Sequence, residues 1–223
     1  MKRLTFAACA GLLAVTMAAP SFAADLPRPA YKAPIYTAPF SWTGFYVGLN
    51  GGYGWGKSSW TSTLGTTGDF NTTGYLFGGT LGYNLQTGVW VWGLEGDLDY
   101  STIKGSTTTF CGAPGCETRN TWLGTARGRI GYAWDRFLPF ITGGAAFGGI
   151  KMTPAGGVSE TKTKLGWTLG AGVEYAFMGA WSAKLEYLYV NLGKTTCGIA
   201  TCGIATDVDF RSNIVRLGLN YRF

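Results

Sequence analysis

Three carboxylates occur at every second position of one stretch, as Glu95, Asp97 and Asp99. If this stretch is a β-strand, successive side chains point to opposite faces, so the three carboxylates share one face. Such a face could line a path for cations or bind a metal ion. Arg127 and Arg129 repeat the same spacing in the next apolar stretch and offer the acids ionic partners. The sequence therefore favours ion pairing, with a cation path or metal site as the alternative.

More charged residues lie on the polar face of stretches whose other face is apolar. Burying an unpaired charge is costly, and pairing with an opposite charge reduces that cost. Five acids and five bases share this pattern, so we expect a charge network that neutralises itself inside a closed lumen. The expected members are Glu95, Asp97, Asp99, Arg127, Arg129, Glu174, Lys184, Glu186, Arg216 and Arg222.

The residue types give little support to catalysis. The chain contains no histidine, which excludes serine–histidine and histidine–aspartate arrangements. Its 36 glycines are spread along the alternating stretches and form no phosphate-binding loop. The net charge of +6 is not gathered in a Lys/Arg run. We therefore predict no catalytic residues, no bound metal, no cofactor and no nucleic-acid partner.

Cysteines form a second candidate group. Cys111/Cys116 and Cys197/Cys202 are two pairs with the same spacing, whereas Cys9 lies in the N-terminal apolar run. An even number of cysteines in an exported chain indicates disulfides. Four cysteines allow three connectivities, of which the two local pairs are the simplest. Zinc is the alternative that this spacing permits, but histidine is absent and the compartment is oxidising.

The elements that must position these residues are strands. Eight stretches alternate between apolar and polar or small residues, which is the periodicity of a β-strand. Only 13% of the residues are charged and 15% are aromatic, as expected when one face of a closed sheet contacts lipid. We predict an all-β fold, an eight-stranded antiparallel up-and-down transmembrane β-barrel. The expected strands span residues 44–55, 75–85, 90–101, 121–134, 137–150, 164–177, 181–191 and 208–223.

The connections alternate between long and short. Residues 56–74 and 102–117 read as long polar loops, whereas the intervening connections are short turns. Outer-membrane barrels have long extracellular loops and short periplasmic turns. The last strand ends on Tyr221 and Phe223, which looks like the sorting signal that the barrel-assembly machinery recognises.

The N-terminal region reads as a targeting segment. Residues 1–23 combine a short basic start, an apolar run and a small-residue cleavage site, the three parts of a secretory signal peptide. Residues 24–40 contain four prolines and are expected to form an extended periplasmic tail, because proline resists both helix and central strand. Residues 41–223 form the expected barrel domain.

Several motifs, at residues 24–27, 42–48, 138–145, 166–175 and 184–189, are together similar to those of one family. The chain resembles the alphaproteobacterial outer-membrane immunogenic proteins, which are opacity-like, porin-superfamily barrels of eight strands. The resemblance implies a major surface protein that supports envelope integrity, tied in some relatives to lipopolysaccharide or peptidoglycan. Some relatives bind haemin, but without histidine a haem iron here would need Tyr, Met or Cys.

These observations predict a structural surface protein of the bacterial outer membrane whose lumen is plugged by salt bridges. A narrow porin-like channel for small solutes and a haemin-binding receptor are the alternatives. The expected partners are outer-membrane lipids with lipopolysaccharide, the barrel-assembly machinery and peptidoglycan. We expect a monomer.

Overall fold

A computed structural model describes residues 40–62, 65–109, 115–154, 159–197 and 206–223. The residues expected to form the signal peptide and almost all of the Pro-rich tail lie outside these ranges. The described residues form nine strands: β1 (Gly44–Ser62), β2 (Gly65–Thr87), β3 (Trp90–Ser101), β4 (Lys104–Thr107), β5 (Cys116–Tyr132), β6 (Phe137–Thr153), β7 (Glu160–Met178), β8 (Trp181–Cys197) and β9 (Thr206–Arg222). No helix within these ranges is both long and apolar enough to cross a membrane.

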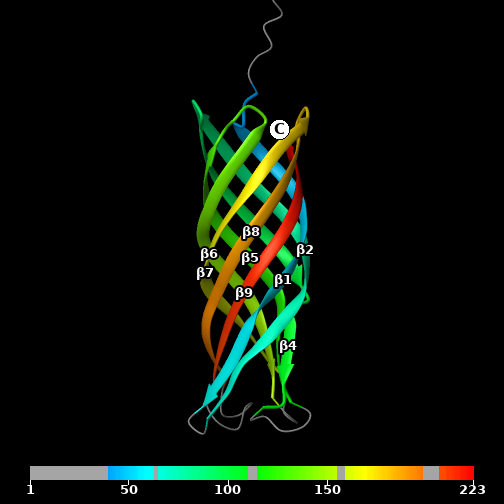
Figure 1. Ribbon diagram of the computed structural model, residues 1–223, viewed down its shortest axis with the longest axis vertical. Helices are drawn as coiled ribbons and strands as arrows, with labels where there is room; N and C mark the ends of the chain where they lie inside the picture. Colours follow the sequence, from blue (N-terminus) through cyan, green and yellow to red (C-terminus); the bar gives the residue numbers. More distant parts are fainter. Residues whose placement is uncertain (1–39, 63–64, 110–114, 155–158, 198–205) are drawn as a thin grey trace, which may run out of the picture. The chain divides into compact units, whose positions relative to one another are not determined.

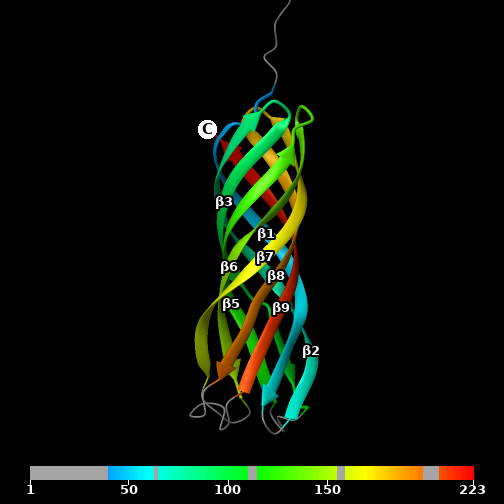
Figure 2. The same ribbon diagram turned by 90° about the vertical axis from the view of Figure 1, so that its left-hand side faces the viewer.

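The strands form one antiparallel sheet that closes on itself. β1 pairs with β2 on one side and with β9 on the other, so the first and last strands meet (Figures 1 and 2). β4 follows β3 and occupies the same place between β2 and β5. The ring therefore closes through eight strand positions, and the predicted fold class is confirmed.

Two ends of the barrel domain can be told apart. At one, here called the turn end, short turns join β2 to β3, β5 to β6 and β7 to β8. Gly88 and Gly179 take positive φ angles of 65° and 51° in two of these turns, a conformation that glycine adopts without steric cost. At the other end, here called the loop end, β1, β4, β6 and β8 end and β2, β5, β7 and β9 begin.

Most strands are longer than the sequence predicted. The expected bounds of the third strand match β3, but residues 56–74, expected to be a loop, continue β1 and β2 as a paired hairpin as far as Ser62 and Gly65. Thr and Ser are abundant in this stretch and occur in both turns and strands, so the sequence did not distinguish the strand extension from a loop. Trp60 and Phe70 face inward there and are buried, which fixes the hairpin. Residues 102–117, also expected to be a loop, contain β4.

The outer face carries the apolar side chains that alternation assigned to it. Leu49 and Leu94 each have 73% of their surface exposed, and the predicted outward faces of all eight strands are confirmed. Aromatic pairs lie on this face near the turn end, including Trp90 with Tyr132 (ring centroids 5.7 Å apart) and Trp181 with Tyr221 (5.1 Å). The apolar surface of this sheet therefore points outward.

The lumen contains two apolar clusters that the sequence analysis did not predict. The turn-end cluster is built around Trp42 and Leu138 and joined by Phe40. The loop-end cluster is larger. It consists of Trp60, Phe70, Leu76, Ile103, Cys116, Leu123, Ala146, Ile150, Met152, Leu188, Val190, Leu192, Val208, Phe210 and Ile214.

Candidate functional site: the lumen charge layer

The strand register brings the predicted acids and bases together. Glu95 on β3 lies directly opposite Arg127 on β5, and Glu186 on β8 lies opposite Arg216 on β9. Each side chain points inward because its neighbours on the strand point outward. The term lumen charge layer is used here for the buried residues Glu95, Asp97, Asp99, Arg127, Arg129, Glu174, Lys184, Glu186 and Arg216.

Arg127 lies at the centre of the layer and contacts three acids. Its Nη2 atom donates to Glu95 and to Asp97, the latter at 2.8 Å, and its Nη1 atom donates to Glu186 at 2.6 Å. Its Nε atom donates to the Thr125 hydroxyl at 2.8 Å. Charge-assisted hydrogen bonds of this kind are stronger than neutral ones and fix the direction of the guanidinium plane.

Arg216 reaches the same acids from the opposite wall. Its Nη1 atom donates to Asp97 at 3.0 Å and to Asp99 at 2.9 Å, and its Nε atom donates to Glu186 at 2.8 Å. Asp97 and Glu186 therefore each contact both Arg127 and Arg216. Arg216 is the one ionic partner of Asp99 among the described residues.

A second group of contacts extends the layer toward the turn end. Lys184 donates to Glu95 at 2.8 Å, and Arg129 donates to Glu174 at 2.7 Å. The Tyr46 hydroxyl donates to Glu95 at 2.6 Å. The Arg129 guanidinium also lies 4.1 Å from the centre of the Phe140 ring, a cation–π distance.

The position of Arg222 differs from the predicted one. It was expected in the lumen charge layer, but no ion pair among the described residues includes it. Arg222 lies at the end of β9 and its guanidinium faces the rings of Phe40, at 4.4 Å, and Trp42, at 5.7 Å. The cause is its position, beyond Asn220 at the turn end and level with these aromatic rings. The layer therefore holds five acids and four bases, not five of each.

Glycine provides the space for these long side chains. A Cβ atom added to Gly52 would lie 2.6 Å from Cβ of Arg216, and one added to Gly93 would lie 2.7 Å from Cγ of Arg129. These separations are shorter than van der Waals contact, so a larger residue would displace either arginine. Glycine at these two inward positions therefore leaves room for the arginine side chains.

Apolar side chains cover the layer on both sides. Toward the loop end, Leu188 follows Glu186 on the inward face of β8 and is fully buried. Toward the turn end, Trp42 is 1% exposed, and its indole Nε1 donates to the backbone oxygen of Asp135 at 3.0 Å. Its backbone amide donates to Oε1 of Gln86 at 2.7 Å. The charges thus lie between two apolar clusters.

The cysteine predictions fall partly outside the described residues. Cys111 and Cys202 lie outside them, and nothing is described of the Cys197 side chain. Cys116 begins β5 and is disulfide-bonded. Within the described ranges, no group of three or more His, Cys, Asp and Glu side chains is arranged to hold a metal ion.

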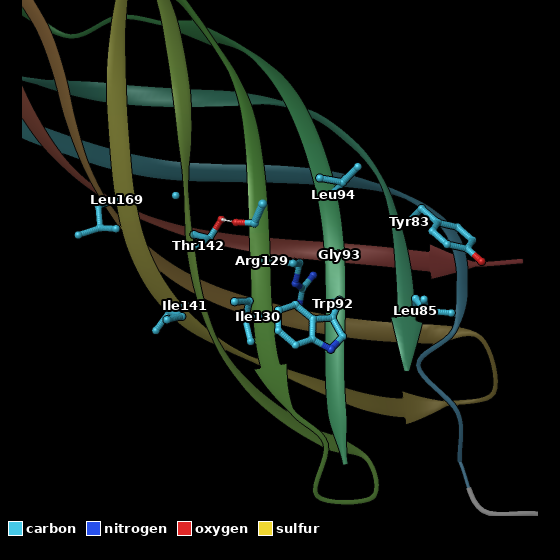
Figure 3. A pocket seen from close by; sticks show the side chains of 12 residues that line it. Tyr83, Leu85, Trp92, Gly93, Leu94, Arg129, Ile130, Ile141, Thr142 and Leu169 are labelled. Atoms are coloured by element: carbon cyan, nitrogen blue, oxygen red, sulfur yellow. Dashed lines mark hydrogen bonds between the residues drawn. The ribbon is translucent and has the colours of Figure 1, made fainter. Parts of the chain in front are cut away.

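A groove of about 640 Å³ lies on the outer wall, across neighbouring strands from β2 to β7. Trp92, Leu94 and Ile130 contribute apolar side chains to it, and Gly128 leaves room between strands. Figure 3 shows these side chains together with Thr142, whose hydroxyl donates to the Gly128 carbonyl at 2.9 Å. Its exposed apolar side chains all face outward, so the groove opens on the outer face of the sheet.

The comparisons with known proteins agree with this architecture. The family model described as outer membrane protein beta-barrel domain matches residues 7–223. The chain therefore belongs to this family of outer-membrane β-barrel proteins, and its location is the bacterial outer membrane. The outward apolar face is accordingly the face that contacts lipid. By the general rule for outer-membrane barrels, we expect the turn end to be periplasmic and the loop end extracellular.

Named relatives narrow the family further. The chain is 37% identical over 247 residues to the 31 kDa outer-membrane immunogenic protein of Brucella melitensis biotype 1, with all of both chains covered. It is 35% identical over 196 residues to the 22 kDa outer membrane protein of Rhizobium leguminosarum bv. viciae, covering 87% of this chain and 83% of that one. The predicted membership among the outer-membrane immunogenic proteins is confirmed.

A solved structure shares the fold at low identity. The outer membrane protease OmpT from Escherichia coli matches with a TM-score of 0.50 and 9% identity, covering 81% of this chain and 97% of that one. At this identity the match supports the barrel architecture alone.

Proposed function

We propose that this protein is a structural barrel of the outer membrane that supports envelope integrity and does not conduct solutes. The observation that carries the proposal is the three-part filling of the lumen, with an ionic layer between two apolar clusters. A hydrated ion entering from either end would meet apolar side chains, which exclude water. Beyond them it would meet guanidinium and carboxylate groups that already bond one another.

We infer no catalytic role. The carboxylates of the layer are occupied by arginine and lysine, and Glu95, Asp97 and Glu186 are nearly without exposed surface. A substrate would have to displace buried ion pairs to reach them, at a cost of several kcal/mol per uncompensated charge.

The proposed partners are the lipids of the outer membrane, including lipopolysaccharide, the barrel-assembly machinery and peptidoglycan. Tyr221 and Phe223 support the second of these. Both side chains face outward, with ring centroids 5.3 Å apart, and the Phe223 amide donates to the Phe45 carbonyl at 2.9 Å. The proposed assembly signal therefore lies at the seam where the barrel closes.

Conductance in planar lipid bilayers tests the closed lumen. The refolded monomer is inserted and its current recorded, and heat-dependent gel migration of the same sample verifies folding. We expect no steady conductance. A steady current that scales with salt concentration would support a narrow channel and refute the proposal.

Absorbance spectroscopy tests the haemin alternative on the same preparation. Haemin is titrated into the refolded protein and the Soret band is followed. We expect no saturable shift, because the chain contains no histidine to serve as an axial ligand of the haem iron. A saturable shift would assign a binding function that the lumen does not explain.

A further inference from the structure

Three cations lie side by side on the outer wall near the loop end. Lys104 on β4 pairs with Arg119 on β5, and Arg119 pairs with Lys151 on β6. Their strand neighbours Thr118 and Met152 are buried in the lumen, so these cations point outward. Lys104, Arg119 and Lys151 are called the cationic row below.

Hydroxyl groups continue the cationic row at both ends. Thr73 on β2 pairs with Lys104, and Thr161 on β7 pairs with Lys151. Lys and Arg carry only donors, and a Thr hydroxyl can donate as well. Five neighbouring strands therefore present a continuous line of hydrogen-bond donors to the outside.

Among the described residues, no acid lies within ion-pair distance of the cationic row. Residues directly opposite in an antiparallel sheet have Cβ atoms about 5 Å apart, and like charges there are destabilising. No ion pair among the described residues includes Lys104, Arg119 or Lys151. The Nε atom of Arg119 is buried and has no hydrogen-bond partner within the part of the chain that the structure describes. Glu117, two residues away on β5, forms no ion pair with these cations within the described residues.

A second pair of opposed cations shows the contrast. Lys57 on β1 lies opposite Arg211 on β9, also near the loop end. Each has an acid beside it, since Lys57 lies 3.7 Å from Asp69 and Arg211 lies 2.9 Å from Asp209. Opposed cations on the outer wall can therefore have acidic partners in this barrel, and the cationic row differs from Lys57 and Arg211 in this respect.

An apolar groove lies on the membrane side of the cationic row. It has a volume of about 450 Å³ and is lined by Leu98, Tyr100 and Trp122. Tyr100 and Trp122 pair across β3 and β5, and a register shift between Asn120 and Trp122 separates this level from Arg119. Aromatic residues of this kind mark the membrane interface in outer-membrane barrels.

We propose that the cationic row binds a phosphate group of a phosphorylated lipid of the outer leaflet, with an acyl chain of that lipid in the groove below. A guanidinium forms two parallel bonds to a phosphate, and the flanking lysines add charge on either side. This inference rests on the proposed lipid partner of the protein. It does not rest on a closed lumen.

Binding of diphosphorylated lipid A to the refolded protein in detergent tests the proposal. The triple variant Lys104→Gln, Arg119→Gln, Lys151→Gln removes the charges, and the single variant Arg119→Gln covers failure of the triple variant to fold. We expect the triple variant to bind roughly ten- to hundredfold more weakly, the loss expected for charge-assisted contacts to phosphate. Heat-dependent gel migration verifies that each variant is folded.

The matched control is the double variant Lys57→Gln, Arg211→Gln. It also removes opposed outer cations, but these already have acidic partners, so we expect binding within about threefold of the unmodified protein. Equal losses in this variant and the triple variant would indicate non-specific attraction and overturn the proposal. So would unchanged binding in the triple variant.

Two further probes identify the source of the phosphate. Dephosphorylated lipid A is expected to bind the unmodified protein about as weakly as lipid A binds the triple variant. Inorganic phosphate at the same concentration is expected not to compete, because it lacks the acyl chain. Equal binding of lipid A with and without its phosphates would refute phosphate recognition by the cationic row. Effective competition by inorganic phosphate would refute a lipid site. Bilayer conductance of the unmodified protein is recorded separately. The closed-lumen proposal and the lipid-phosphate proposal can therefore each fail without the other.

Discussion

Replacing Arg216 by Met should destabilise the barrel by about 3–5 kcal/mol, the usual cost of breaking a buried ion pair by removing one partner. The structure indicates why the cost is not several times larger. Of the four acids that Arg216 contacts, Glu95, Asp97 and Glu186 keep Arg127 as a partner. Asp99 loses its one ionic partner among the described residues. One carboxylate is thus left uncompensated.

Equilibrium urea unfolding of the barrel, followed by tryptophan fluorescence, measures this cost by linear extrapolation. The matched control is Arg222→Met, on the same strand and face. Arg222 is half-buried and contacts two aromatic rings, so its loss should cost only about 1 kcal/mol. If the two substitutions cost the same within error, the ion pairs of the layer do not stabilise the fold and the reasoning fails.

A double-variant cycle gives an independent measurement. Adding Asp99→Asn to Arg216→Met removes the carboxylate that would otherwise stay unpaired. We expect the double variant to be more stable than Arg216→Met alone by at least about 1 kcal/mol, within the range found for contacting residues. Strict additivity of the two substitutions would contradict the assigned partnership.

Three further predictions follow from the lumen. Because acids outnumber bases in the layer, Asp99→Asn should cost at least about 1 kcal/mol less than Glu186→Gln in urea unfolding; equal costs would contradict the charge count. Gly52→Val should abolish the heat-modifiable folded band, since its Cβ would overlap Arg216, whereas Gly96→Val on the outer face should keep it. Trp42→Ala should cost about 3–5 kcal/mol, the range for a buried aromatic, and a loss under 1 kcal/mol would exclude it as a structural plug.

Alternation within each strand was enough to predict the fold and the direction of most side chains. The period of two separates Leu94 from Glu95 and Leu217 from Arg216 without any knowledge of neighbours. The up-and-down order of an antiparallel barrel places β3 next to β5, and this neighbourhood pairs Glu95 with Arg127. These inferences needed only local spacing and one rule of topology.

The sequence alone did not predict the level of each inward side chain along the barrel axis. Strand tilt and stagger decide which inward residues share a level, and Arg222 was misplaced because its level depends on that stagger. The apolar part of the lumen was missed although Leu188, Val190 and Leu192 continue the inward alternation of Glu186. Leu188 and Val190 lie within the expected strand 181–191 and Leu192 lies one residue beyond it, so following the inward face of that strand to its end would have revealed them.

The β1–β2 hairpin affects how an antibody would recognise this protein. From Trp55 to Ser62 the chain is paired on both sides except at Trp60, where a register shift interrupts the pairing with β2. This segment is ~24 Å long at the usual rise per residue. The surface it offers is built from residues of two or three strands held in fixed register. Antibodies raised against the intact barrel should therefore bind poorly to linear peptides from this segment. A vaccine design that preserves the paired hairpin should keep epitopes that a peptide loses.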